Sequence, residues 1–190
     1  MKKNLLKSLV LSCVLVCAPV LAFAATYEID PVHSSVTFKV GHLVGKVTGT
    51  FDEFSGTIDF EEERMTTAQI NATVKVASVN TRNEKRDAHL KTPDFFDVEQ
   101  FPDATLVSKY INVEAGQIHA DLTLHGVTKE VILDFVYNGS APDQGGKIHI
   151  GGTATTKFDR RDFGMEYDPT GAGVGHQVEL ELQIEAVEKK

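Results

Sequence analysis

The strongest pattern in the chain is the stretch Gln177-Val178-Glu179-Leu180-Glu181-Leu182-Gln183-Ile184-Glu185-Ala186. Every second residue in it is apolar, and every intervening residue is Gln or Glu. Successive side chains of a β-strand point to opposite faces, so this alternation predicts a strand with one oily and one polar face. The same period of two recurs over residues 35–40, 70–76 and 117–124, which indicates that β-sheet dominates the fold.

Weaker runs of the same kind extend the pattern along the chain. They predict further strands at 45–54, 56–61, 104–112, 129–138 and 147–157. Turn pairs such as His125-Gly126 and Asn138-Gly139 separate several of these runs, and such residues tolerate positive φ. Consecutive hairpins of this type predict an antiparallel meander.

Helical patterning is confined to about Asn83–Leu90, with a second short turn near Pro93–Phe96. One or two short helices cannot cover a sheet of this size. The oily face must therefore be buried against the sheet itself, either in a closed barrel or in a two-layer sandwich. Alternation alone leaves both architectures open, and no repeat or linker indicates a second domain.

The N-terminus has the pattern of a cleaved signal peptide. Lys2, Lys3 and Lys7 precede an apolar run over residues 9–21, which closes on Ala22-Phe23-Ala24. A permanent membrane span needs roughly 20 apolar residues, and this run is shorter. We therefore expect residues 1–24 to be removed and residues 25–190 to form one domain in the periplasm, without stable membrane insertion.

Both cysteines, Cys13 and Cys17, lie inside this N-terminal segment. Acylation of one of them would make the protein a lipoprotein, but Val16 is bulky for the position before an acylated cysteine, and Cys13 comes too early. We interpret both as apolar members of the signal segment. The exported domain then has no disulfide and no thiolate chemistry.

The charge balance limits the partners. The chain carries a net charge of −8, and loss of the basic N-terminal segment makes the remainder more acidic. Nucleic acids require clustered Lys and Arg, and anionic membrane surfaces make a similar demand. We therefore expect no nucleic-acid partner.

The segment around the predicted helix carries the most suggestive polar residues. If it is helical, Arg82, Arg86 and His89 share one face, and two guanidiniums with an imidazole would suit a phosphate or a carboxylate. The alternative, favoured by spacing alone, is that Arg86 pairs with Glu84 or Asp87 on a solvated face.

Other chemistry finds little support. The chain has seven histidines, but no His-x-His, no HExxH and no helical pair at i, i+4, so no metal site is predicted. The glycine-rich run 170–175 lacks phosphate-loop spacing and precedes a strand, which indicates a flexible loop at a rim. No GxSxG motif occurs. We expect no catalytic residues and no cofactor.

Several ordered motifs resemble the YceI-like family of periplasmic polyisoprenoid-binding proteins. The resemblance covers nearly all of the chain after residue 24. The motifs that carry it are Asp30-Pro31-Val32-His33-Ser34, Gly49-Thr50-Phe51, Phe54-Ser55-Gly56, Ser78-Val79-Asn80-Thr81, Arg86-Asp87-Ala88-His89-Leu90, Pro93-Asp94-Phe95-Phe96-Asp97-Val98, Phe101-Pro102, Leu122-Thr123-Leu124-His125-Gly126-Val127-Thr128-Lys129 and Arg161-Asp162-Phe163-Gly164.

This resemblance implies an all-β, lipocalin-like fold: an extended eight-stranded antiparallel barrel with one or two short helices. It implies that the interior carries or stores a long isoprenoid lipid, such as a polyprenyl lipid or an isoprenoid quinone, or another long-chain apolar ligand, without converting it. The candidate ligand-binding residues, at a polar mouth or an apolar entrance, are His33, His42, Arg86, Asp87, His89, Phe95, Phe96 and Arg161. The polar members have barrel-closing hydrogen bonds as an alternative role, and the phenylalanines have core packing.

Two other functions stay open at this point. One is an enzyme that acts on such a lipid, and the other is a stress-related interaction protein whose barrel is packed solid. The oligomeric state is also open, with a homodimer as one alternative.

Overall fold

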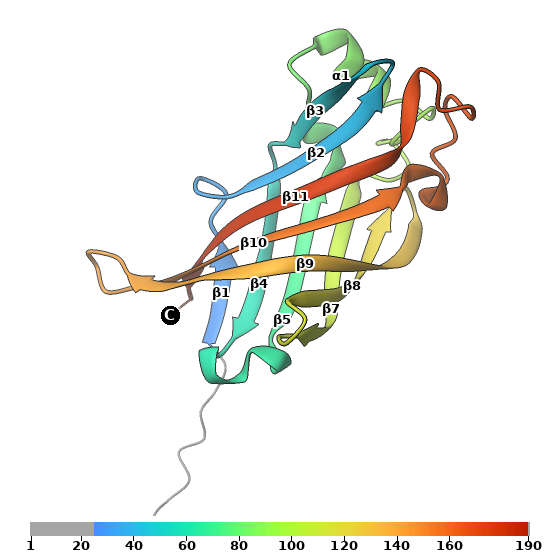
Figure 1. The fold of residues 1–190 in the computed structure, drawn as a ribbon. Coiled ribbons are helices and arrows are strands. Elements are labelled where there is room, and N and C mark those ends of the chain that lie inside the picture. Colours follow the sequence, from blue (N-terminus) through green and yellow to red (C-terminus); the bar gives the residue numbers. More distant parts are fainter. Residues whose placement is uncertain (1–24, 190) are drawn as a thin grey trace, which may run out of the picture.

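The computed structural model describes residues 25–189 and shows a closed antiparallel barrel (Figure 1). Eight strands form the ring. Their order around it is β1 (Ala25–Ile29), β4 (Phe54–Phe60), β5 (Gln69–Lys75), β7 (Asp103–Asn112), β8 (Gln117–Leu124), β9 (Val127–Pro142), β10 (Ile148–Asp159) and β11 (Val174–Glu188). Pairing of β11 with β1 closes the ring. The expected eight-stranded barrel is confirmed, and the sandwich alternative is wrong.

Three further strands lengthen the barrel at one end: β2 (Ser35–His42), β3 (Gly45–Phe51) and β6 (Val79–Asn80). β2 continues β1 after a bend at 30–34, β3 runs on into β4, and β6 follows β5 through a 3-10 turn (Val76–Ser78). β11 therefore pairs with β2 along its first half and with β1 near its end. The predicted signal segment, with Cys13 and Cys17, lies outside the described residues.

The predicted strand positions hold with local corrections. The bounds of β8 agree with the sequence pattern, whereas β9, β10 and β11 are longer than expected. The break in the predicted 45–61 region falls at 52–53, and the short strands β1 and β6 were not predicted. The short turn expected near Pro93–Phe96 is confirmed, with the Phe95 amide donating to the Thr92 carbonyl at 3.0 Å.

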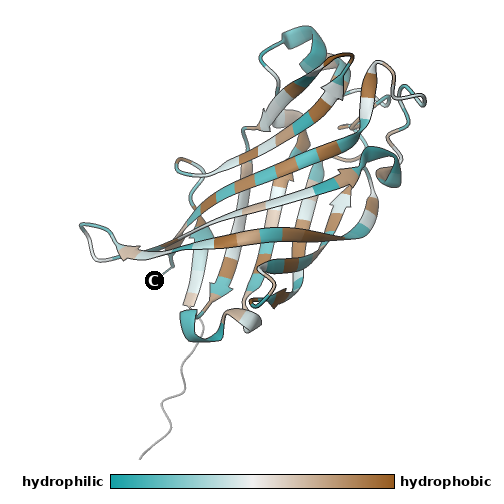
Figure 2. Cartoon of the chain, viewed as in Figure 1, coloured by the Kyte–Doolittle hydropathy of each residue, from teal (hydrophilic) through white to brown (hydrophobic). Residues whose placement is uncertain are grey.

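Alternation along the strands separates the two faces of the barrel wall, as the banding of β11 in Figure 2 shows. On β8 the buried side chains are Ile118, Ala120, Leu122 and Leu124. On β11, Glu179 and Glu181 face outward. Glu179 pairs with Lys46 of β3 at 2.6 Å, and Glu181 pairs with Lys39 of β2 at 3.4 Å. The interior is thereby left to apolar groups.

Helix α1 (Glu84–Leu90) lies at the same end of the barrel as the β2–β3 hairpin (Figure 1). Its N-cap is Asn83, whose side chain accepts a hydrogen bond from the Arg86 amide at 3.0 Å. The segment after the 3-10 turn Arg160–Phe163 reaches this end too, because the Leu43 amide donates to the Gly173 carbonyl at 3.1 Å. We call this the α1 end; the 3-10 segment Glu62–Thr67 marks the opposite end.

Candidate functional site

The barrel encloses a cavity of about 560 Å³. Inward-facing aliphatic and aromatic side chains from nearly every strand form its wall, among them Val36, Leu106, Leu122, Leu133 and Leu182. A volume of this size is within the range of pockets that hold small organic ligands. The alternative of a barrel packed solid by its own side chains is therefore wrong.

Aromatic rings pack at the end of the cavity away from α1. Phe60 lies between two tyrosines, with its ring centroid 6.2 Å from Tyr27 and 5.3 Å from Tyr137. The Tyr137 hydroxyl donates to the Glu62 carboxylate at 3.5 Å. Burial raises the pKa of both tyrosines, so both hydroxyls stay neutral at physiological pH. This end of the cavity thus carries no charge on its aromatic rings.

The cavity opens at the α1 end. His42, Lys85 and Tyr167 line the cavity at this end and are exposed to solvent, and we call the opening that they border the mouth. The ring of His89 lies 5.1 Å from the rings of both Phe95 and Tyr167, in edge-to-face contacts. Its Nε2 is 2.8 Å from the Asp94 carboxylate, which holds the imidazole in place. The mouth therefore combines aromatic walls with a few cationic or titratable groups.

Arg86 and Asp87 fix the helix to the barrel. The Arg86 guanidinium donates to the Thr81 hydroxyl at 2.7 Å and to the Thr81 carbonyl at 2.8 Å. The Asp87 carboxylate accepts from the Thr81 amide at 2.9 Å and from its hydroxyl. Thr81 itself is buried. These contacts hold α1 against the end of β6 and shape the mouth.

The expected shared helical face of Arg82, Arg86 and His89 is wrong for its first member. Arg82 precedes the N-cap and has a left-handed backbone with φ of 61°, so it does not belong to the helix. The alternative pairing of Arg86 with a nearby acid is not what the structure shows either, since its guanidinium donates to two atoms of Thr81.

The structure divides the candidate residues into two groups. His42, Arg86, His89, Phe95 and Phe96 line the cavity, whereas His33, Asp87 and Arg161 do not. Arg161 pairs with Asp159 on the surface, with the guanidinium Nε 3.0 Å from the nearer carboxylate oxygen. Their role in ligand binding stays a prediction.

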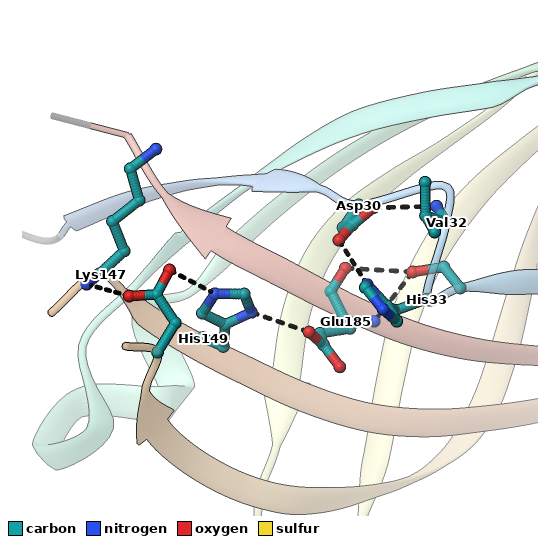
Figure 3. A network of polar contacts seen from close by, with 8 residues as sticks. Asp30, Val32, His33, Lys147, His149 and Glu185 are labelled. Atoms are coloured by element: carbon teal, nitrogen blue, oxygen red, sulfur yellow. Dashed lines mark hydrogen bonds and ion pairs between the residues drawn. The ribbon is translucent and has the colours of Figure 1, made fainter. Parts of the chain in front are cut away.

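His33 belongs to a polar network on the outer wall, at the bend between β1 and β2 (Figure 3). Its Nδ1 lies 2.7 Å from the Asp30 carboxylate, which raises the pKa of His33 and lowers that of Asp30. The Ser34 hydroxyl donates to the backbone carbonyl of Glu185 at 3.1 Å and accepts from its amide at 2.9 Å. The network therefore fixes the bend onto β11.

The network continues from Glu185 to His149, whose Nδ1 is 2.7 Å from the Glu185 carboxylate. Ligand-type atoms of Asp30, His33 and Glu185 lie within 4.8 Å of one another, a grouping that the spacing of histidines along the chain did not indicate. The Asp30–His33 and Glu185–His149 hydrogen bonds give these groups a structural role.

Sequence reasoning missed two charged residues that line the cavity, Lys85 and Arg160, and Arg160 is the buried one. It is 3% exposed, and its guanidinium donates to the backbone carbonyls of Met165, Asp168, Val174 and Gly175. Burial lowers its pKa. It also lines the cavity, so it organises the segment 165–175 around the mouth. No strand pattern could have found it, because β10 ends at Asp159 and Arg160 begins the 3-10 turn that follows.

Residues 170–173 form a loop at this rim, as expected, whereas Val174 and Gly175 already belong to β11. The Asp168 carboxylate accepts from the amides of Gly173 at 2.7 Å and Val174 at 2.8 Å, and these bonds hold its pKa far below the usual range. In the part of the chain that the structure describes, no helix is long and apolar enough to cross a membrane.

A closed antiparallel barrel with an apolar cavity that opens at one end defines a lipocalin-like binding protein. Comparison with known proteins narrows this class. The chain belongs to the YceI-like family, whose YceI-like domain matches residues 27–186. A UPF0312 protein of Shewanella baltica is 38% identical over an alignment that covers 100% of both chains.

Solved structures agree with this assignment. The YceI protein of Campylobacter jejuni is 35% identical, with a TM-score of 0.70 over 76% of this chain and 86% of that one. A polyisoprenoid binding domain from Saccharophagus degradans shares the fold at 15% identity, with a TM-score of 0.62 over 88% of this chain and 100% of that one. The family predicted from the motifs is thereby confirmed.

Proposed function

We propose that the protein is a periplasmic carrier that holds a long apolar isoprenoid lipid, a polyprenyl lipid or an isoprenoid quinone, inside its barrel. The observation that carries this proposal is the apolar cavity of about 560 Å³ that runs from the Phe60 rings to a mouth at the α1 end. The name of the Saccharophagus degradans domain, which shares the fold, supports an isoprenoid as guest.

The energetics suit such a guest. Each CH₂ group that leaves water contributes about 0.8 kcal/mol, so a chain of isoprene units binds through area alone and needs few directed contacts. The polar side chains that reach the cavity, including Lys85 and His89, gather mostly at the mouth. This arrangement favours an extended apolar tail inside and a polar end group at the rim.

Two further parts of the proposal rest on sequence and chemistry. The basic and apolar pattern of residues 1–24 supports export to the periplasm. The apolar wall supports binding rather than conversion, because acid–base or nucleophilic catalysis needs polar groups beside the reacting atoms. We therefore propose that the protein is not an enzyme.

The test is direct detection of the guest. The protein is purified without detergent and examined by native mass spectrometry and solvent extraction, then exposed to polyprenyl phosphate or an isoprenoid quinone. Reproducible absence of any lipid, together with no uptake of either compound, would contradict the proposal. Chemically altered lipid after long incubation would instead support an enzyme.

A matched pair of variants locates the guest. Ala154 lines the cavity, whereas Thr155, its neighbour on β10, is exposed. Ala154→Phe places a ring in the cavity and should reduce the amount of bound lipid several-fold. Thr155→Phe adds the same ring to the outer surface and should leave lipid binding unchanged. Equal binding by both variants would place the guest elsewhere.

A further inference from the structure

The tip of the β2–β3 hairpin carries two large apolar side chains that are mostly exposed to solvent. Leu43 is 72% exposed and Val44 is 106% exposed, and the tip is brown in Figure 2. His42 pairs with Gly45, so Leu43 and Val44 form a two-residue hairpin loop. Among the described large hydrophobic side chains, only Val32 and Val136, at 82% and 65% exposed, are comparably accessible, and neither belongs to this hairpin.

The backbone makes Leu43 an unfavourable choice for this position. Its φ is 49°, in the left-handed region that two-residue hairpin loops give to Gly, Asn or Asp. A leucine there is strained, and its exposed side chain gains nothing from the barrel core. Folding therefore does not account for this residue, and we look for its role outside the chain.

The tip stands beside the mouth of the cavity. Gly41 and His42, which directly precede it, line the cavity. The Leu43 amide is bonded to the Gly173 carbonyl in the rim loop, which fixes the tip in place. Tyr167, 41% exposed, adds an aromatic ring at the same mouth.

The charge near the mouth differs from that of the whole chain. Although the net charge is −8, residues 82–91 contain Arg82, Lys85, Arg86 and Lys91 against Glu84 and Asp87. The Asp87 carboxylate and the Arg86 guanidinium are both engaged by Thr81, which leaves Arg82, Lys85 and Lys91 against Glu84. Lys85 is exposed at the cavity rim. The composition of the whole chain hides this local excess of positive charge.

We propose that the β2–β3 tip and the basic side chains of residues 82–91 dock the mouth onto the surface of an anionic lipid bilayer. This proposal rests on the proposed carrier function and adds the source from which the carrier is loaded. Apolar side chains that enter the interface, next to Lys and Arg that meet anionic headgroups, are the two contributions that bind a protein to such a surface.

Docking in this orientation would let the lipid enter the barrel without crossing water. A long isoprenoid chain leaves a bilayer through water only slowly, because all of its apolar surface becomes exposed. With Leu43 and Val44 in the interface, the mouth bounded by His42 and Tyr167 faces the bilayer. The lipid can then pass between two apolar environments.

The experiment is flotation of the exported domain with vesicles of phosphatidylethanolamine and phosphatidylglycerol, compared with vesicles of phosphatidylcholine alone. We expect binding to the anionic vesicles that salt weakens. The double variant Leu43→Gly, Val44→Ser should lower the vesicle affinity by at least about tenfold, because two apolar side chains no longer enter the interface. Lys85→Gln with Lys91→Gln should weaken binding to anionic vesicles selectively.

Val32→Ser is the matched control. Val32 is 82% exposed, but it lies before the first residue of β2, whereas the tip follows the last. This variant should bind vesicles like the wild type. If the wild type fails to bind anionic vesicles, or if the hairpin variant binds as well as the wild type, the proposal is wrong.

Two readouts separate this proposal from its neighbours. Leu43→Gly removes the strained backbone of leucine, so the hairpin variant should keep or raise its Tm while it loses vesicle binding; a fall in both would indicate a structural role and overturn the proposal. Uptake of the quinone from detergent micelles tests the carrier function without a bilayer. The hairpin variant should load normally from micelles but slowly from vesicles.

Discussion

Replacement of Arg160 by methionine is the sharpest test of how the mouth is built. The side chain is almost fully buried, and its guanidinium donates only to backbone carbonyls of the 165–175 segment. The distances are 3.0 Å to Gly175, 3.1 Å to Val174 and 3.2 Å to Asp168, and a fourth bond goes to Met165. Methionine keeps most of the apolar stem but donates nothing. Four backbone carbonyls of residues 165–175 then lose the N–H groups that donate to them.

The expected cost follows from these contacts. A buried carbonyl that loses its donor costs about 1–3 kcal/mol, and water will reach some of the four carbonyls at the rim. We therefore expect Arg160→Met to lower the free energy of unfolding by about 3–5 kcal/mol. Arg161→Met, one residue further on, breaks only an exposed pair with Asp159 and should cost about 0–1 kcal/mol.

The assay is urea denaturation followed by circular dichroism, because the chain has no tryptophan to report by fluorescence. Proteolysis of the folded protein should also cut the 165–175 segment faster in Arg160→Met. If Arg160→Met lies within about 1 kcal/mol of the wild type, or if Arg161→Met costs as much, the assigned role of the buried guanidinium is refuted.

Three further predictions concern the framework around the cavity. First, the pairing with Asp30 raises the pKa of His33 above 6.5 and lowers that of Asp30 below 3.8. The stability that the pair contributes should therefore fall as pH rises through the folded pKa of His33, and it should also fall as pH drops through the folded pKa of Asp30. If the difference in urea midpoint between the wild type and His33→Gln does not change with pH, this prediction is wrong. Second, a Cβ at Gly56 would lie 2.5 Å from the Asn71 carbonyl oxygen, so Gly56→Ala should cost about 1–3 kcal/mol by thermal unfolding, whereas Gly41→Ala, with 3.8 Å to its nearest neighbour, should cost far less. Third, Thr81→Val removes the hydroxyl that Arg86 and Asp87 share and should lower stability by about 1–3 kcal/mol; amide exchange that stays slow in α1 would show that other contacts hold the helix.

The sequence predicted the barrel wall well because alternation is a local signal. Residues 117–124 and 177–186 show which side chains face inward without any knowledge of their partners. The bends within the wall were harder to predict. β1 and β2 follow each other along the barrel wall and are separated by a bend at residues 30–34. β1 has only five residues, so its pattern is too short to stand out.

The site was less predictable because it depends on distances that no local pattern contains. Alternation shows that Leu122 and Leu182 face inward, but the size of the ring decides whether they meet or leave a cavity. Motif resemblance pointed to Arg161, whereas the 3-10 turn after β10 turns Arg160 into the interior. The contact of His33 with the network around Glu185 joins the first and last strands and is absent from any window of the sequence.

The double pairing of β11 has a consequence for the order of folding. The partners of this strand, β1 and β2, come first among the strands of the described chain, whereas β11, with fifteen residues, comes last. During synthesis the N-terminus emerges first, so the central hairpins can form early. The barrel cannot close until β11, the last strand, has been made and has paired with β1 and β2. Such distant pairing slows folding, and it leaves the oily inner face open to the surroundings until the final strand docks.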